Sequence, residues 1–138
     1  MEKAAFSFKR YHFDDIHLCF SKIDNPELEL VFNPEGIFKE KSKTFELKLQ
    51  FKAILVSTQE EIISVQCIAE FNFSDDVVTV ADIPEFFYAN SIAIIFPYIR
   101  SFISTLTLQA NYNPLVLATM NLSSLKGTLK EHTTTSKE

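Results

Sequence analysis

The side chains that could do chemistry in this 138-residue sequence are few and far apart. Its histidines and cysteines do not occur at the spacings that metal ligands use: His12, His17, His132, Cys19 and Cys67. Its adjacent carboxylates form three pairs at expected turns or strand ends: Asp14-Asp15, Glu60-Glu61 and Asp75-Asp76. Carboxylates in open positions are solvated, whereas acid–base catalysis needs shifted pKa values. We therefore expect no enzyme, no metal site and no cofactor, and both cysteines are expected to be buried free thiols.

Composition excludes further classes of protein. Two glycines can hardly build a phosphate-binding loop, and the G-x-S-x-G motif of hydrolases is absent. A formal net charge of −5 and a pI near 5.2 argue against nucleic-acid binding. The first residues, Met1-Glu2-Lys3, do not resemble a basic and then apolar signal segment. The sequence thus predicts a cytoplasmic binding protein.

The elements that would position a binding surface begin with four strands. Residues 45–55 and 63–73 alternate strictly between apolar and polar side chains, and a polar hairpin separates them. Residues 6–20 and 28–32 alternate less regularly, with a phase shift near Lys9-Arg10 or Asp14-Asp15 that predicts a β-bulge. Alternation of this kind is typical of an antiparallel sheet with one buried face.

Residues 82–111 predict one long helix. Asp82 and Glu85 have the spacing of a capping box, Pro84 falls in the first turn, and Pro97 should bend the axis. About 28 helical residues would span roughly 40 Å, close to the width of a compact chain of this size. Residues 92–96 are apolar on every side, which one subunit cannot easily cover. We therefore expect an oligomer whose interface uses the apolar residues of this helix: Ile95, Phe96, Ile99, Phe102, Ile103 and Leu106.

The same helix is long enough to cross a membrane, but Arg100 would lie in the span at a cost of at least a few kcal/mol. We therefore expect no membrane insertion. Asn113-Pro114 should end the helix, and a second, short helix is expected to start at Asn121. The resulting fold class is α+β: a four-stranded antiparallel sheet, one long kinked helix packed on it, and a short C-terminal helix. Residues 1–131 would form one domain, and residues 132–138 a polar disordered tail.

Several segments resemble the SecB family of export chaperones. They are the Phe-Pro-Tyr-x-Arg core within residues 94–100, the connecting segment 113–122, and strand residues 8–11, 15–16 and 26–30. The resemblance extends over nearly the whole chain, roughly residues 6–125.

The resemblance implies a SecB-like α+β subunit that assembles as a dimer of dimers. It also implies an ATP-independent holdase that binds unfolded polypeptide clients along apolar grooves. Carried over position by position, the groove residues belong to the second strand, the connecting loop and the second helix: Leu28, Leu30, Phe32, Leu115, Leu117, Leu122 and Leu125.

Two departures from the family pattern bear on partners. The connection at residues 21–25 is shorter than the family's crossover loop and lacks its aromatic residue. Family members dock the SecA motor through acidic residues; Asp15 matches one position, but Cys19 and Gln66 stand at the other two, which weighs against SecA docking. Three functions stay open: a holdase for many preproteins, a chaperone dedicated to one partner such as an antitoxin or one secreted protein, and a domain for oligomerisation or apolar-ligand binding.

Overall fold

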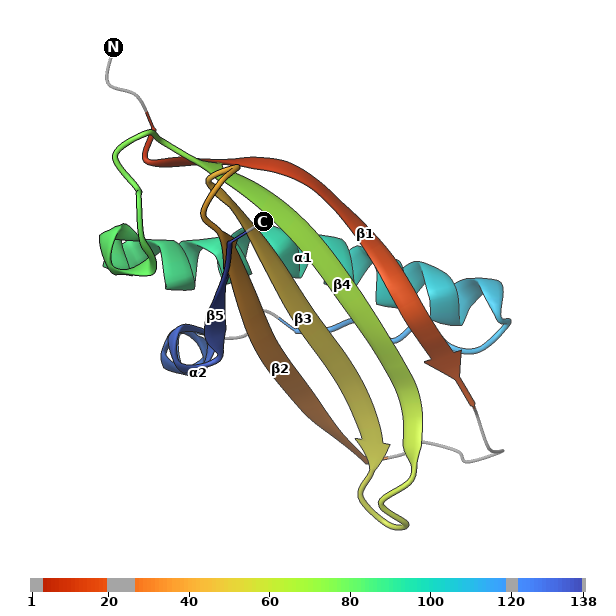
Figure 1. Ribbon diagram of the computed structural model, residues 1–138. Helices are drawn as coiled ribbons and strands as arrows, with labels where there is room; N and C mark the ends of the chain where they lie inside the picture. Colours follow the sequence, from red (N-terminus) through yellow and green to blue (C-terminus); the bar gives the residue numbers. More distant parts are fainter. Residues whose placement is uncertain (1–3, 20–26, 119–121, 138) are drawn as a thin grey trace.

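The computed structural model describes residues 4–19, 27–118 and 122–137. A single sheet is covered on one face by a long helix, and a short helix lies at one edge (Figure 1). The elements follow in chain order: β1 (Phe6–Leu18), β2 (Leu28–Lys39), β3 (Thr44–Leu55), β4 (Glu61–Phe73), the 3-10 turn η1 (Val80–Asp82), α1 (Glu85–Gln109), α2 (Leu125–Glu131) and β5 (Thr133–Ser136).

The strand order is β1-β4-β3-β2-β5, so β1 and β5 form the two edges of the described sheet. Neighbours among the first four strands are antiparallel, as predicted, but β5 runs parallel to β2. The prediction of four antiparallel strands was therefore wrong: the sheet has five strands of mixed orientation. Residues Thr133–Ser136, which we expected to be disordered, pair with the edge of β2. Three consecutive β-branched threonines favour an extended backbone once an open edge is available.

The phase shift predicted in the first strand is present at both candidate places. The pairing of β1 with β4 changes register between Phe8 and Arg10 and again between Asp14 and His17. Asp15 lies within the second irregularity and has a positive φ of 52°. These bulges allow β1 to keep Phe8, Tyr11 and Phe13 near α1 despite the interrupted alternation.

The core lies between the sheet and α1. Five apolar residues of α1 repeat at helical spacing and are fully buried: Phe87, Ile92, Ile95, Ile99 and Ile103. The ring of Phe87 meets those of Phe6, Phe45, Phe71 and Phe73 at centroid distances of 4.8 to 5.4 Å. Three of the four strands that run beside α1 thus converge on its first turn.

The start of α1 differs from the prediction. The helix begins at Glu85, and the Asp82 carboxylate accepts hydrogen bonds from the backbone N–H groups of Val78 and Thr79, each at 3.0 Å. These bonds lower the pKa of Asp82. Asp82 therefore closes the preceding turn instead of capping α1.

Length and hydropathy alone would allow α1 to span a membrane, and it is the one described helix with this property. In the fold, its buried stripe packs on the sheet. Pro97 lies inside α1, which continues on both sides of it.

Candidate functional site

The seven residues predicted to line a groove come from three parts of the chain and pack against one core. β2 contributes Leu28, Leu30 and Phe32, which share the sheet face that α1 covers. The other four lie after α1: Leu115 and Leu117 in the linker, Leu122 just before α2, and Leu125 at its first residue. Six of the seven are half-buried and keep exposed apolar surface. Leu117, at 1% exposure, is a core residue instead.

On its inner side, this apolar strip is continuous with α1. The ring of Phe32 lies 5.2 Å from that of Phe51 and 6.0 Å from that of Phe96, measured between centroids. In Figure 1, α2 lies beside β2 at the β5 edge of the sheet. We call these seven predicted residues the β2–α2 groove; six of them pack against the core and keep exposed apolar surface, and Leu117 is part of the core itself.

Two hydroxyl groups of α1 hold the start of the linker. The buried Thr107 hydroxyl donates to the carbonyl of Ile103 at 2.9 Å and accepts the N–H of Leu115 at 2.9 Å. The Ser104 hydroxyl donates to the carbonyl of Leu115 at 3.1 Å. The sequence analysis gave neither residue this role. The available signal was the position of Thr107, four residues after Ile103 in the buried stripe.

The helix residues predicted to form an oligomer interface divide into two groups. Ile95, Ile99 and Ile103 are fully buried inside the subunit and offer no surface to a second copy, so their assignment to an interface is corrected here. The other three are half-buried and pack against the core: Phe96, Phe102 and Leu106. The ring of Phe102 stacks on that of Phe13 of β1 at 4.1 Å.

The side of α1 away from the sheet is also partly apolar. Phe86 and Leu108 are exposed at 53% and 56% of their surface, and Ala93 and Pro97 are also exposed. Tyr98 is 38% exposed, but its ring packs on those of Phe8 and Tyr11 of β1 at 5.8 and 4.3 Å. The apolar run at residues 92–96 could not reveal which of its members face the sheet. The exposed set follows from the observed contacts, and it is the surface of α1 available to a partner.

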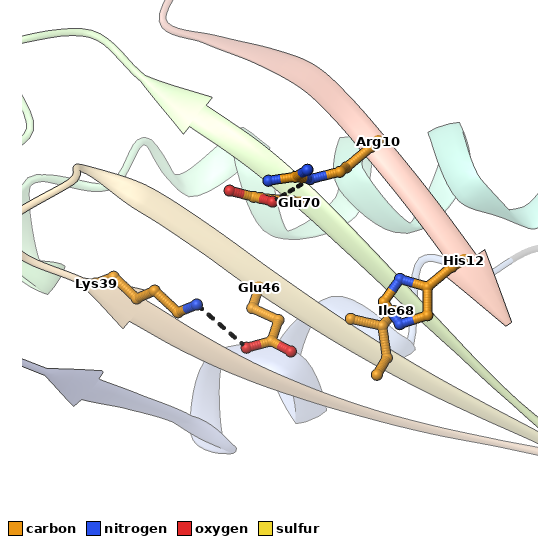
Figure 2. Close-up of a pocket in the computed structure, with 6 residues that line it drawn as sticks. All are labelled: Arg10, His12, Lys39, Glu46, Ile68 and Glu70. Atoms are coloured by element: carbon orange, nitrogen blue, oxygen red, sulfur yellow. Dashed lines mark hydrogen bonds and ion pairs between the residues drawn. The ribbon is translucent and has the colours of Figure 1, made fainter. Parts of the chain in front are cut away.

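The opposite face of the sheet is charged (Figure 2). Glu70 of β4 accepts from Arg10 at 2.7 Å and from Lys9 at 3.4 Å, and Lys39 pairs with Glu46 at 3.7 Å. These pairs flank a hollow of about 100 Å³ that His12 and Ile68 also line. The hydrogen bond from Arg10 lowers the pKa of Glu70. Acidic groups on this part of the surface are therefore neutralised by neighbouring cations.

The three positions compared with a motor-docking surface lie on or beside this charged face. Asp15, at the bulge of β1, lies 3.2 Å from a ring nitrogen of His17. The Gln66 side chain donates to Asp14 at 2.9 Å. Cys19 is exposed, contrary to expectation, whereas Cys67 is buried and its pKa is raised to about 12 by burial. No group of three or more His, Cys, Asp or Glu residues gathers at metal-binding distance within the described ranges.

Three comparisons place this geometry among known proteins. The model of the SecB family, described as preprotein translocase subunit SecB, matches residues 6–130. A curated relative, the uncharacterized protein MJ0357 of Methanocaldococcus jannaschii, is 40% identical over 47 residues; the match covers 34% of this chain and 30% of that protein. The chain thus aligns with less than a third of that relative's length.

A similar solved structure is the Mycobacterium tuberculosis Rv1957 SecB-like chaperone in complex with a ChAD peptide from the Rv1956 HigA1 antitoxin. It superposes with a TM-score of 0.69 at 15% identity, covering 85% of this chain and 88% of that one. At this identity the match shows a shared fold.

Proposed function

Because this chain belongs to the SecB family, we propose that it is an ATP-independent chaperone that holds non-native polypeptides in the β2–α2 groove. The observation that carries the proposal is the half-buried state of six groove residues, five leucines and Phe32, that pack against one core. Such side chains lose further water-exposed area when an apolar segment lies on them, at about 25 cal/mol per Å². Many weak contacts of this kind tolerate clients of different sequence.

No step of this function needs a catalytic group. Holding a chain requires apolar surface and open backbone edges. In the described part of the chain, β5 pairs only with Gly36–Lys39 of β2, so the earlier residues of β2 can add backbone hydrogen bonds to an extended client. Net negative charge would also attract clients with exposed basic residues. We propose no cofactor for this chain, and action in the cytoplasm.

A second candidate is a chaperone dedicated to one partner. The peptide in the Rv1957 complex comes from an antitoxin, which makes a single aggregation-prone client a reasonable alternative here. The paired charges around Glu70 and the contact of Asp15 with His17 also disfavour docking of the SecA motor, so general preprotein export is the weaker version of the proposal.

We further propose that the protein is a homo-oligomer, a dimer of dimers, that uses the exposed side of α1. Phe86, Ala93, Pro97 and Leu108 provide apolar surface there that one subunit leaves uncovered. The native mass in solution tests this directly: a value of one subunit, 15.8 kDa, would remove the oligomer from the proposal.

The test of the function is the refolding of an unrelated, chemically denatured, slow-folding protein without ATP. We expect this chain to delay refolding and suppress aggregation at near-stoichiometric amounts. Leu30→Glu should weaken this effect at least tenfold, because it places a charge in the groove. Val31→Glu is the matched control, because Val31 is the neighbouring residue on the other face of β2.

The outcomes separate the candidates. Equal loss in both variants would show damage to β2 and remove Leu30 from the site. No effect of the wild-type protein on an unrelated client would favour the dedicated chaperone, which co-purification of one partner from the native host would then identify.

A further inference from the structure

α2 cannot hold its own position. It has seven residues and no side-chain hydrogen bond at its N-cap. Gly127 lies in its middle, and no other part of the protein packs closely against that position. Isolated helices of fewer than about 12 residues are marginal in water, and glycine weakens them further. Leu129 is its one buried residue. Whatever fixes α2 must therefore come from contacts outside the helix.

One of these contacts is an ion pair at the surface. The Lys130 ammonium group lies 2.8 Å from the Glu85 carboxylate, but 55% and 75% of the two side chains are exposed. The same ammonium group is 5.9 Å from the centre of the Tyr88 ring. Exposed pairs contribute little, so this contact cannot be the main anchor of α2.

The stronger attachment is β5, which follows α2 after His132. The N–H of Gly36 donates to the carbonyl of His132 at 3.2 Å, and the N–H of Glu40 donates to that of Ser136 at 2.9 Å. Gly36 pairs with Thr133, and the register continues to Lys39 with Ser136. Each end of β5 is thereby joined to the edge of β2.

The same strand is joined to α2 by a side chain. The Thr133 hydroxyl donates to the carbonyl of Leu129 at 2.7 Å, across the turn between α2 and β5. Gly36 leaves room for this arrangement, because a Cβ there would run into the Phe45 ring and lie 2.9 Å from the Thr133 hydroxyl. α2, β5 and β2 thus form one connected unit at this edge.

We propose that β5 is a clasp that holds α2 against β2 and so sets the wall of the β2–α2 groove. The inference rests on the proposed function, in which this groove binds polypeptide. If the site is complete only while α2 is docked, the apparent affinity for a client is the affinity of the docked state multiplied by the fraction of molecules in which α2 is docked. Thr134 and Ser136 are positioning residues, since they act through α2.

The ladder geometry supplies a matched pair of variants. In a parallel ladder with the observed register, the N–H groups of Thr134 and Ser136 face β2, and that of Thr135 faces away. Proline removes the N–H group of the residue it replaces. Thr134→Pro therefore breaks the clasp, whereas Thr135→Pro makes the same substitution one residue later and keeps the ladder.

Two readouts are measured on each full-length variant: amide hydrogen exchange across the chain, and the Kd for reduced, carboxamidomethylated α-lactalbumin, which stays unfolded. We expect Thr134→Pro to remove most of the protection at residues 125–131 and to raise the Kd about tenfold. Thr135→Pro should stay within twofold of wild type in both. Unchanged exchange in β3 and β4 checks that the core is folded.

Unchanged protection of α2 in Thr134→Pro would overturn the clasp. Lost protection with an unchanged Kd would overturn its role in binding, and a lower Kd would mean that β5 competes with clients. If the wild-type protein does not bind α-lactalbumin at all, the proposed general holdase fails, while the exchange data still decide whether β5 anchors α2.

Discussion

The two faces of the sheet are held together by different forces. On the face under α1, residues such as Phe45, Phe87 and Ile99 have no exposed surface, and their rings and branched side chains interlock. On the opposite face, pairs such as Arg10 with Glu70 remain in contact with water. Buried apolar area contributes most of the stability, whereas exposed ion pairs typically contribute below about 1 kcal/mol. The groove lies at the edge of the apolar face, where contacts become partial.

The largest effect is expected at the centre of the apolar face. Ile99→Asp would bury a carboxylate without a partner, which costs more than about 4 kcal/mol and approaches the whole stability of a small domain. We expect the variant to be unfolded, with the circular dichroism spectrum of an unfolded chain and poorly dispersed amide signals in NMR. Ser101→Asp, on the exposed side of the same helix, should fold normally. A folded, soluble Ile99→Asp variant would contradict the assignment of this residue to the subunit core.

The contrast between the faces also explains what the sequence could predict. Period-two alternation in β3 and β4 follows directly from one buried face, and the interruptions at Lys9-Arg10 and Asp14-Asp15 correctly indicated bulges. The α+β class followed from this alternation together with the long apolar helix predicted at residues 82–111.

Other features depend on information outside the local pattern. β5 was missed because a short run of polar threonines lacks the apolar alternation that marks a strand. Its pairing depends on the open edge of β2, which lies nearly a hundred residues earlier in the chain. The acidic residue at position 82 fits either helix cap or turn, and tertiary contacts selected the turn. In an apolar run such as residues 92–96, the direction toward the sheet is decided by packing and not by hydropathy.

At the groove, Leu28, Leu30 and Phe32 of β2 and Leu125 of α2 pack against one core, although β2 extends to Lys39, beyond the predicted residues 28–32. The second helix begins later than predicted, at Leu125 after Ser124, and the expected cap Asn121 lies outside the described residues, as does the short connection at 21–25. Leu117 could not be distinguished from its neighbours by sequence, although it alone is fully part of the core.

An intermediate effect is expected where the apolar face meets the linker. Thr107→Val keeps the shape of the side chain but removes the acceptor for the N–H of Leu115, which should lower the free energy of unfolding by about 1–3 kcal/mol. Thr105→Val, exposed on the same helix, should change it by less than about 0.5 kcal/mol. Chemical denaturation of both variants measures the difference. Equal stabilities would mean that the linker is not held through Thr107.

The smallest effect is expected on the charged face, and it depends on pH. Because Arg10 lowers the pKa of Glu70 below the usual 4.5, the Glu70 pair stabilises the fold above that pH, and the contribution disappears as pH falls through the lowered value. Glu70→Gln should therefore cost no more than about 1 kcal/mol at neutral pH and flatten the loss of stability between about pH 5 and pH 3. The prediction is tested by measuring the thermal unfolding of Glu70→Gln across this pH range. Glu46→Gln, which removes the longer ion pair with Lys39, is the comparison variant. A loss at neutral pH as large as that in Thr107→Val would mean that the charged face carries stability comparable to the apolar one, and the division between the two faces would fail.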